Sequence, residues 1–597
     1  MAQFNDQQLA AVQCDGNLLV VAPPGSGKTG TLVGKAMRIL RADGTRVGMV
    51  TFTRAAAAEM RARVLAKKSG GFGHRVTAET FHRHALAQLR SLKMAPRLLE
   101  PRESRDLLVS AIAQSGCGLG YEEALGEIES AKSLLTFDCR AEGTSELVQV
   151  YQDMLRSRRA VDLMDVIRLA VEGMRAGRFP PLRVTHLLCD EMQDADAWQL
   201  QWCYAHADAG VVTTLVGDDD QSLYSFRHAL GYAGMLAFKE RCKATQVNLA
   251  INYRSRQEIL LSALAVIRNN SARIDKEVLC VKGTGGRVLR HDLGTAAEEA
   301  NVVADLIEAS APERTWGILA RSNHALRNVA SELRSRGIPY SRKEDADEED
   351  PASLTMARLL VAIEQADTIM LEGALRSLGV GMRTLDAVRH AMGPEFAAIL
   401  DGELPPMGDV TRFDPEDVEL LRRLSTDYLK AWRDQLEVGE VGKVLDRVVH
   451  YIQHESRLVN DKTSDDFEAN VRRVRERRGS LKARVAYMLM PARGTNRGES
   501  RVDLQTFHGA KGLEYDSVFL VRCNEGEVPS TKAEDLEEER RGFYVALTRA
   551  RDDLFVSCVR SSGAPSRFVA EIFEALPGVE GIGPAPAVEP AVPRRAA

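Results

Sequence analysis

No stretch of the 597 residues approaches the roughly 18 uninterrupted apolar residues that a membrane-spanning helix requires, so we expect no contact with a membrane. The first six residues, MAQFND, lack the basic and then apolar layout of a signal peptide. The nine cysteines include no CxxC pair, which argues against a zinc ribbon, a disulfide framework and an iron–sulfur cluster. We therefore expect a cytoplasmic protein in a reducing compartment.

An excess of positive charge is also missing. The net charge is −5, so the composition as a whole gives no sign of nucleic-acid binding. A protein that follows a nucleic-acid strand needs only a local basic channel, however, so this balance does not exclude one. Apolar residues make up 44% and charged residues 27% of the chain, which is ordinary for a folded protein too long for a single hydrophobic core.

Short apolar stretches that end in polar or glycine-rich loops and lead into helices occur in two regions. They are residues 17–21, 47–50, 184–189 and 211–216 in the first region, and 288–290, 316–320 and 518–521 in the second. This alternation predicts an α/β protein with two parallel sheets, each with its ligand site at the carboxyl ends of the strands.

Helical periodicity with few strand signals interrupts both regions, which predicts two mostly helical insertions. The acidic run 344–350 has the composition of a linker into the second insertion. The last residues are rich in proline, alanine and glycine, and we expect them to be disordered. The predicted parts are a first α/β domain (1–82 and 160–246), its insertion (83–159), a second α/β domain (247–343 and 494–576), its insertion (344–493) and the tail (577–597).

A phosphate-binding loop follows the first predicted strand. It consists of Ala22, Pro23, Pro24, Gly25, Ser26, Gly27, Lys28 and Thr29. The glycines of such a loop let backbone N–H groups curl around phosphates, Lys28 reaches the β and γ oxygens, and Thr29 supplies a ligand to Mg²⁺. Ala22 stands where the motif has glycine, so a chance glycine-rich turn is the competing interpretation, but the strand before and the helix after favour the nucleotide loop.

The pair Asp190-Glu191 ends a predicted buried strand. In a nucleotide site Asp190 holds Mg²⁺ through its water shell, while Glu191 polarises the attacking water. A solvated acidic loop is the alternative explanation, but the strand end and the preceding phosphate loop favour the nucleotide site. These residues predict a bound nucleotide together with Mg²⁺, for which Thr29 and Asp190 are the metal ligands.

Asp190-Glu191-Met192-Gln193-Asp194 resembles the DExQD signature of UvrD/Rep/PcrA-like superfamily 1 helicases. Other motifs of that family follow in order: the adenine-reading motif at 4–8, motifs Ia and Ib at 51–60 and 80–82, motif III at 217–224, motif IV at 252–255, motif V at 506–514 and motif VI at 544–550. The resemblance covers nearly the whole chain. It implies two RecA-like P-loop NTPase motor domains, each with a mostly helical inserted subdomain.

The resemblance also implies roles at the nucleotide. Gln8 hydrogen-bonds the adenine, Tyr253 stacks on it, and Glu514 lies near the ribose. Arg254 and Arg549 reach the γ-phosphate from the second α/β domain as arginine fingers, which stabilise the charge that develops during phosphoryl transfer. Surface ion pairs are the alternative explanation for the arginines, and packing in the core is the alternative for Tyr253.

A strand of any sequence is held by base stacking and backbone contacts rather than by reading base edges. By resemblance, Gln221 senses the γ-phosphate and links it to the DNA-facing end of motif III. The candidate DNA contacts are Phe52, Thr53, Thr80, His82, Tyr224, Phe226, Arg227 and His508. Core packing is the alternative for each aromatic residue. Two positions depart from the family pattern, because Phe226 replaces the usual Trp and Arg54-Ala55 replaces Asn-Lys.

Two features of the second insertion point to duplex DNA. Residues 377–384 resemble the Gly-x-Gly duplex-contacting turn of the family, with Gly379 and Gly381 as the contacts. Exposed N–H groups of such a turn can bind a phosphate. Residues 471–478 include five arginines, which indicate either a duplex contact or, more commonly, a solvated helix face.

These motifs together predict an ATP-driven 3′→5′ DNA helicase, a monomer or weak dimer, that acts on single-stranded DNA and on single-strand/duplex junctions. The direction rests on the resemblance alone, and the sequence indicates no protein partner. One alternative is a single-strand-stimulated ATPase that displaces proteins from DNA or needs a partner to unwind. Another alternative is a nucleotide-gated binding or signalling module that does not cycle as a motor. The presence of all four residues Glu191, Gln221, Arg254 and Arg549 argues against it.

Overall fold

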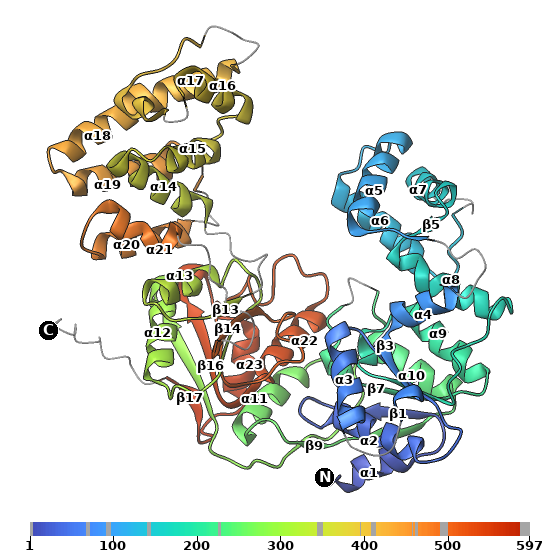
Figure 1. The fold of residues 1–597 in the computed structure, drawn as a ribbon. Coiled ribbons are helices and arrows are strands. Elements are labelled where there is room, and N and C mark those ends of the chain that lie inside the picture. Colours follow the sequence, from blue (N-terminus) through green and yellow to red (C-terminus); the bar gives the residue numbers. More distant parts are fainter. Residues whose placement is uncertain are drawn as a thin grey trace. The chain divides into compact units, whose positions relative to one another are not determined.

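The computed structural model divides into two compact units. The first is formed by Met1–Gly285 with Asp535–Tyr544, and the second by Gly286–Glu534 with Val545–Ala597. Figure 1 shows a group of strands and a separate group of helices in each unit. The structure describes residues 4–66, 72–90, 97–139, 145–224, 228–342, 350–393, 396–407, 413–456, 458–459, 464–489 and 500–585.

The first unit is built on a six-stranded parallel sheet in the order β3-β2-β6-β7-β1-β8. The strands are β1 (Leu18–Val21), β2 (Val47–Thr51), β3 (Val76–Thr80), β6 (His186–Cys189), β7 (Val212–Gly217) and β8 (Thr245–Asn248). The four strands predicted from the sequence of this region are confirmed as β1, β2, β6 and β7. They are consecutive neighbours at the centre of the sheet, which explains their almost wholly apolar sequences.

Helices cover both faces of this sheet. Along β1, Leu19 and Val21 lie in one hydrophobic core, while Leu18 and Val20 lie in another. The helices on the two faces are α1 (Asp6–Gln13), α2 (Lys28–Leu40), α3 (Arg54–Ala66), α4 (Phe81–Arg90), α8 (Leu163–Arg175), α9 (Ala197–Asp208) and α10 (Gly231–Arg241). The sequence predicts that the insertion starts at residue 83, within α4, but Phe81, Ala85 and Leu89 of α4 belong to a sheet core.

The first insertion is helical, as predicted. It contains α5 (Pro101–Ser115), α6 (Tyr121–Ser133) and α7 (Glu146–Ser157), which share a core of their own that includes Leu107, Ile128 and Leu147. The chain enters and leaves it through two short paired strands, β4 (Arg97–Leu98) and β5 (Ala160–Val161). Figure 1 shows α5, α6 and α7 together beside β5 and away from β1 and β7.

The second unit holds a seven-stranded parallel sheet in the order β13-β14-β12-β15-β16-β11-β17. The strands are β11 (Arg287–Leu293), β12 (Trp316–Ala320), β13 (Ser341–Arg342), β14 (Val502–Thr506), β15 (Tyr515–Leu520), β16 (Ala550–Val559) and β17 (Ile582–Pro584). The three strands predicted in this region are confirmed as β11, β12 and β15. The fold class predicted from the sequence, α/β with two parallel sheets, is therefore correct.

Two groups of helices belong to the second unit. Beside the sheet are α12 (Ala296–Ala309), α13 (Arg327–Ser335), the end of α22 (Leu536–Leu547) and α23 (Arg567–Ala575). The second insertion contains α14 (Pro351–Gln365), α15 (Thr368–Ser377), α16 (Met382–Met392), α17 (Pro415–Arg423), α18 (Lys430–Glu437), α19 (Val441–His454), α20 (Ser464–Glu476) and α21 (Leu481–Leu489). In the described part of the chain, no helix combines the length and the apolar character needed to cross a lipid bilayer.

The prediction of a disordered tail is wrong for Ile582–Pro584, which form β17. The Val288 N–H donates to the Gly581 carbonyl at 2.6 Å, and the Ala585 N–H donates to the Arg290 carbonyl at 2.7 Å. Pro584 is tolerated because β17 is an edge strand, where the missing N–H need not reach a neighbour. Residues 586–597 of that tail, and residues 344–349 of the acidic linker, lie outside the described residues.

Residues 247–285 pack with the first unit, although the sequence predicts that the second α/β domain starts at 247. Strand β8 pairs with β1 up to Asn248, and β9 (Ile251–Asn252) and β10 (Leu279–Cys280) form a small pair of their own around α11 (Gln257–Ile267). The Asn252 amide donates to the Pro24 carbonyl at 2.8 Å. The segment after β8 is thus tied to the phosphate-binding loop.

Candidate functional site

The predicted phosphate loop lies between β1 and α2. The Ala22 N–H donates to the Gly217 carbonyl at 2.9 Å, which fixes the start of the loop against β7. Gly25 and Gly27 have φ of +70° and +83°, a left-handed conformation that side chains disfavour. A Cβ on Gly25 would lie 2.6 Å from Cβ of Arg254. The glycines therefore let the loop coil tightly and end at the N-terminus of α2, where backbone N–H groups attract a phosphate.

Four side chains of the predicted nucleotide site meet at the ends of β1 and β6. Lys28 Nζ lies 4.0 Å from Glu191 Oε2. Thr29 Oγ1 lies 3.4 Å from Asp190 Oδ2. Asp190 is only 4% exposed, and this burial, together with the neighbouring charge of Glu191, raises the pKa of its carboxyl to about 7. A cation bound beside this carboxyl would favour its charged form.

Thr29 and Asp190 offer oxygen atoms of the kind that Mg²⁺ prefers. Within the described residues, no group of three or more histidine, cysteine or acidic side chains could hold a metal by itself. Mg²⁺ keeps several waters and is commonly bound by one or two protein oxygens together with phosphate oxygens of the substrate. One hydroxyl and one buried carboxylate beside a phosphate loop therefore fit a magnesium–nucleotide complex.

A chain of hydrogen bonds leads from Glu191 to Gln221. Gln193 is fully buried, and its Nε2 donates to Glu191 Oε2 at 2.6 Å. Its Oε1 accepts from the Asp218 N–H at 3.0 Å. The Asp218 carboxylate in turn accepts from Gln221 Nε2 at 2.7 Å. The two ends of this chain, Glu191 and Gln221, are both predicted site residues, and the structure joins them through Gln193 and Asp218.

The predicted adenine contacts also come together in the first unit. Gln8 Nε2 donates to the Ser26 carbonyl of the phosphate loop at 3.0 Å, and Gln8 Oε1 accepts from the Asn5 N–H at 3.2 Å. Asn5 Nδ2 donates to the Tyr253 hydroxyl at 2.8 Å. Tyr253 is 41% exposed, so part of this residue is accessible to a ligand. That this ligand is adenine remains a prediction.

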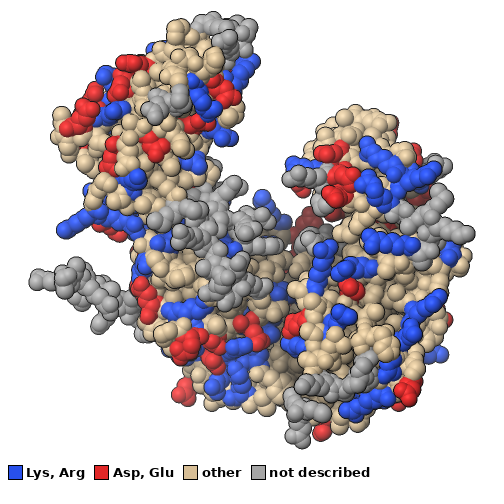
Figure 2. All heavy atoms as spheres, viewed as in Figure 1, with Lys and Arg blue, Asp and Glu red and all other residues tan. Residues whose placement is uncertain are grey.

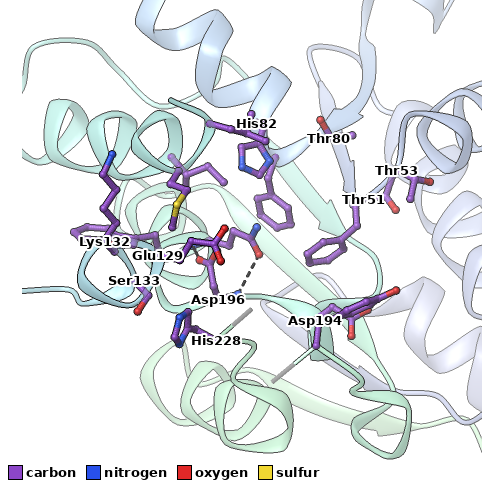
Figure 3. Close-up of a pocket in the computed structure, with 18 residues that line it drawn as sticks. Thr51, Thr53, Thr80, His82, Glu129, Lys132, Ser133, Asp194, Asp196 and His228 are labelled. Carbon is purple, nitrogen blue, oxygen red and sulfur yellow. Dashed lines mark hydrogen bonds between the residues drawn. The ribbon is translucent and has the colours of Figure 1, made fainter. Parts of the chain in front are cut away.

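A pocket of about 550 Å³ collects the candidate DNA contacts of the first unit. Phe52, Thr53, Thr80, His82 and Tyr224 all line it. They come from the ends of β2 and β3 and from the segment after β7, at the same sheet edge as the phosphate loop. Figure 3 shows Glu129, Lys132 and Ser133 of α6 bordering this pocket on the side opposite Thr51 and Thr53.

The pocket is lined by neutral and acidic groups more than by basic ones. Burial lowers the pKa of His82 to about 4, so its ring is neutral at physiological pH. The Lys132 ammonium is buried and is held by Asp162 at 2.6 Å and Asp165 at 2.9 Å. On the face drawn in Figure 2, basic and acidic residues are interspersed. Stacking and local polar contacts therefore suit this pocket better than attraction by an excess of charge.

Besides Gly379 and Gly381 of its insertion, the second unit contains three predicted site residues. Arg549 is 1% exposed and donates to the carbonyls of Val545 at 2.8 Å and Leu513 at 3.2 Å. Glu514 pairs with Arg551, and His508 is half-buried after β14. Their approach to a nucleotide or a strand remains a prediction. Phe226 and Arg227 lie outside the described residues.

The Gly-x-Gly turn of the second insertion is already engaged with a carboxylate. Gly379 has φ of +108°, and Gly381 caps the N-terminus of α16. The Gly381 N–H donates to Asp417 Oδ2 at 3.0 Å, and the Thr384 hydroxyl donates to the same oxygen at 2.6 Å. Asp417 thus occupies the position at which a phosphate would bind this N–H group, so a duplex contact there requires Asp417 to move.

The five arginines of residues 471–478 do not share one role. Some of them contact other parts of the second unit, so the run as a whole is neither a duplex contact nor a solvated helix face. Arg473 on α20 is 7% exposed and binds Glu332 of α13 at 2.7 Å. Arg477 donates to the Ser335 carbonyl at the end of α13 at 2.7 Å. These two side chains attach the insertion to the sheet domain of the second unit. The exposed arginines of the run are Arg472, Arg475 and Arg478.

Several residues at the site carry no distinct signal in the sequence. Asp218 and Gln193 stand inside recognised motifs, but their local sequence does not mark them as links between Glu191 and Gln221. Lys276 and Arg273, which bind the carboxylates of motif III, lie in no motif at all. Buried ion pairs between residues far apart in the chain leave no local pattern, so only the folded structure identifies them.

The fold and the site define a P-loop nucleoside triphosphatase with a second, aromatic-lined pocket at the same edge of its sheet. The family model for the UvrD/REP helicase N-terminal domain matches residues 4–107 and 121–243. The model for the UvrD-like helicase C-terminal domain matches residues 247–393 and 475–561. The chain belongs to the UvrD/Rep/PcrA-like helicase family, and as an enzyme it is an ATP-dependent DNA helicase.

Similar proteins match along nearly the whole chain. The ATP-dependent DNA helicase PcrA of Leuconostoc citreum is 27% identical over 95% of this chain and 84% of its own length. The ATP-dependent DNA helicase UvrD1 of Mycobacterium tuberculosis H37Rv is 29% identical over 96% and 85%, respectively. DNA helicase II of Haemophilus influenzae is 28% identical over 95% and 87%.

Proposed function

We propose that this protein translocates along single-stranded DNA in the 3′→5′ direction and unwinds duplex DNA as it moves. One observation supports the proposed coupling of ATP hydrolysis to DNA binding. The short segment after β7 contributes Asp218 and Gln221 to the chain of hydrogen bonds from Glu191, and it contributes Tyr224 to the pocket. A change at the nucleotide can therefore reach a strand-binding side chain through a few residues of backbone.

At the nucleotide, Lys28 neutralises the β and γ phosphates, and Glu191 polarises the attacking water. Thr29 and Asp190 hold Mg²⁺, which supplies positive charge beside the phosphates when it is bound. Gln193 orients the Glu191 carboxylate through their 2.6 Å hydrogen bond. Gln221 senses the γ-phosphate, and Arg254 and Arg549 act as arginine fingers, in keeping with the family resemblance.

At the strand, Phe52 and Tyr224 stack on bases, an interaction worth roughly 1–3 kcal/mol for each base. Thr53, Thr80 and His82 contact the strand around them. A neutral His82 donates or accepts single hydrogen bonds without a fixed charge, which suits contact with any base. The proposed partners are single-stranded DNA and single-strand/duplex junctions, bound by a monomer or weak dimer.

The direction rests on the resemblance to the family. The test measures ATP hydrolysis with and without single-stranded DNA, together with unwinding of duplexes that carry a 3′ or a 5′ single-stranded tail. We expect DNA to stimulate hydrolysis and only the 3′-tailed duplex to be unwound. Unwinding of only the 5′-tailed duplex would reverse the proposed polarity. Stimulated hydrolysis with removal of bound proteins but no strand separation would instead indicate a protein-displacing translocase.

A further inference from the structure

A buried lysine outside the family motifs stands at the centre of motif III. The Lys276 side chain is 1% exposed, and its Nζ lies 3.2 Å from Asp218, 2.5 Å from Asp219 and 2.8 Å from Asp220. Arg273 binds the Asp220 carboxylate with two hydrogen bonds of 3.0 and 2.7 Å. Three carboxylates and two cations therefore form one buried cluster, whose net charge is −1 when all five groups are ionised.

This cluster fixes the conformation of the segment after β7. Three successive carboxylates reach one ammonium only because residues 219–221 coil into the 3₁₀ turn η3 (Asp219–Gln221). In this turn the Gln221 N–H donates to the Asp218 carbonyl at 2.9 Å. The Ile274 N–H also holds Asp219 Oδ2 at 2.6 Å. Without the ammonium, three buried carboxylates would face one guanidinium, and their repulsion would open the turn.

Asp218 connects the cluster to both ends of the hydrogen-bonded chain. Its carboxylate accepts from Gln221 Nε2 at 2.7 Å, which sets the orientation of the Gln221 amide. Its backbone N–H donates to Gln193 Oε1 at 3.0 Å, and Gln193 Nε2 donates to Glu191 Oε2 at 2.6 Å. A shift of Asp218 therefore changes the positions of Gln221 and, through Gln193, of Glu191.

We propose that Lys276 is a positioning residue for ATP hydrolysis, which holds Asp218 where it orients Gln221 directly and Glu191 through Gln193. The proposal rests on the proposed role of Gln221 at the γ-phosphate. Lys276 acts through Asp218 rather than on the nucleotide. A displacement of about 1 Å in a catalytic group can change a rate by about 10²-fold, so a residue of this kind is expected to affect kcat strongly.

The test compares kcat and KM for ATP, at saturating single-stranded DNA, in three variants. Lys276→Met removes the charge and keeps the bulk, and we expect kcat to fall about 100-fold while KM changes less than about threefold. Lys276→Arg restores a cation and should recover at least about a tenth of the original kcat. The double variant Lys276→Met/Asp219→Asn restores the net charge of −1 without the ammonium on Asp218, so its kcat should stay low.

Recovery of the original kcat by the double variant would overturn the proposal, because the cluster would then serve only to balance charge. Lys35→Met is the matched control. Lys35 is another buried lysine of the first unit, and its Nζ donates to the carbonyls of Ala11 at 3.0 Å and Cys14 at 2.6 Å. This control should lower thermal stability and leave kcat within about threefold. An equal loss of kcat in both methionine variants would mean that any buried lysine has this effect.

Gln221→Ala separates this inference from the proposed function. A large loss of kcat in Gln221→Ala together with normal kcat in a folded Lys276→Met would overturn only the role of Lys276. Normal kcat in Gln221→Ala would overturn the proposed role of Gln221 and, with it, the inference. Loss of kcat in both variants, with recovery by Lys276→Arg, supports the inference.

Discussion

Asp190 and Glu191 are adjacent in the chain, yet their carboxylates have different surroundings. Asp190 is buried, with a pKa raised to about 7 by that burial, and lies beside the Thr29 hydroxyl. The Glu191 side chain is 31% exposed, with Lys28 at 4.0 Å and Gln193 at 2.6 Å. The backbone of Glu191 has φ of +57°, a conformation that is uncommon for residues other than glycine. In the proposed mechanism, Asp190 holds the cation and Glu191 polarises the attacking water molecule.

This division of roles predicts the effect of two substitutions. In the proposed mechanism, Lys28→Ala removes the charge that faces the phosphates, and Glu191→Gln removes the group that polarises the attacking water. Both should abolish DNA-stimulated ATP hydrolysis, because each removes a group that acts on the reacting phosphate or water. The measurement is steady-state phosphate release, with circular dichroism as the control for folding. Near-normal turnover by Glu191→Gln would assign the water-polarising role to another residue.

Arg549 is a third residue whose loss should stop turnover. Its guanidinium is buried and held by the carbonyls of Val545 and Leu513, which restricts its direction. If it serves as an arginine finger, Arg549→Ala should lower kcat by about 10³–10⁵-fold. Arg549→Lys keeps a charge but not the fork of donors, so it controls for charge alone. Normal hydrolysis by the alanine variant would show that Arg549 only supports the second unit.

At the scale of single elements, α20 shows how one helix divides its arginines between two surfaces. Asn470 and Arg473 are three residues apart on α20, so they share one helix face, and Arg477 follows the last residue of the helix. Asn470 accepts from the Ser331 hydroxyl at 2.8 Å, and Arg473 binds Glu332 at 2.7 Å. This face is attached to α13, and the remaining arginines point elsewhere.

Substitution of the exposed arginines tests whether α20 and the residues that follow it bind duplex DNA. Changing Arg472, Arg475 and Arg478 to Gln should flatten the salt dependence of binding to tailed duplex by a slope of about 0.9 for each phosphate that is no longer neutralised. Hydrolysis stimulated by single strands should stay near normal. The measurement is the dissociation constant against salt concentration. A salt slope identical to that of the original protein would make the exposed arginines a solvated surface.

The buried arginine of α20 should behave differently. Arg473→Gln leaves Glu332 with less compensation in a buried position, which costs about 1–3 kcal/mol of the free energy of unfolding. We expect a lower midpoint of thermal unfolding and an unchanged salt slope, the reverse of the exposed set. Equal stability in this variant would show that Arg336, which also pairs with Glu332, is sufficient.

Helix α9 contains a histidine that should make the first unit sensitive to acid. His206 is fully buried, and burial lowers its pKa from 6.5 to about 4. Its Nε2 accepts from the Leu182 N–H at 3.1 Å, so protonation breaks that bond. Because the pKa is lower in the folded state, its contribution is complete above about pH 6.5 and is lost as the pH falls toward 4.

The expected size of this effect is about 2 kcal/mol at pH 5. His206→Gln cannot take up a proton in this range, so its midpoint of thermal unfolding should fall less between pH 7 and pH 5 than that of the original protein. The comparison between the two proteins cancels the other titrating groups. The same pH dependence in both would mean that His206 is protonated as easily in the folded state as in the unfolded state.

At the scale of the whole molecule, the sequence predicts local features well. The phosphate loop, the strands beside it and the acidic pair at the end of β6 are all visible because each depends on a few consecutive residues. The pocket is predictable in part, through Phe52 and Tyr224, since aromatic residues after strand ends gather at one sheet edge.

Features that depend on distant partners could not be predicted in this way. Lys276 contacts Asp218–220 only in the folded structure. Its neighbouring residues in the sequence contain no pattern from which this contact could be predicted. Asp417 reaches Gly381 across two helices of the insertion. Strand β17 escapes detection because an edge strand can form from backbone hydrogen bonds alone, whatever the composition of its side chains.

The division of the chain between the two units has a consequence for synthesis on the ribosome. The first unit includes Asp535–Tyr544, and Glu537 of this segment accepts from the Ser271 N–H at 2.7 Å. Translation at about 5–20 residues per second needs roughly 12–50 s to pass from Gly285 to Asp535. During that interval the nascent first unit lacks its last helical segment and leaves the surface around Asn270 uncovered.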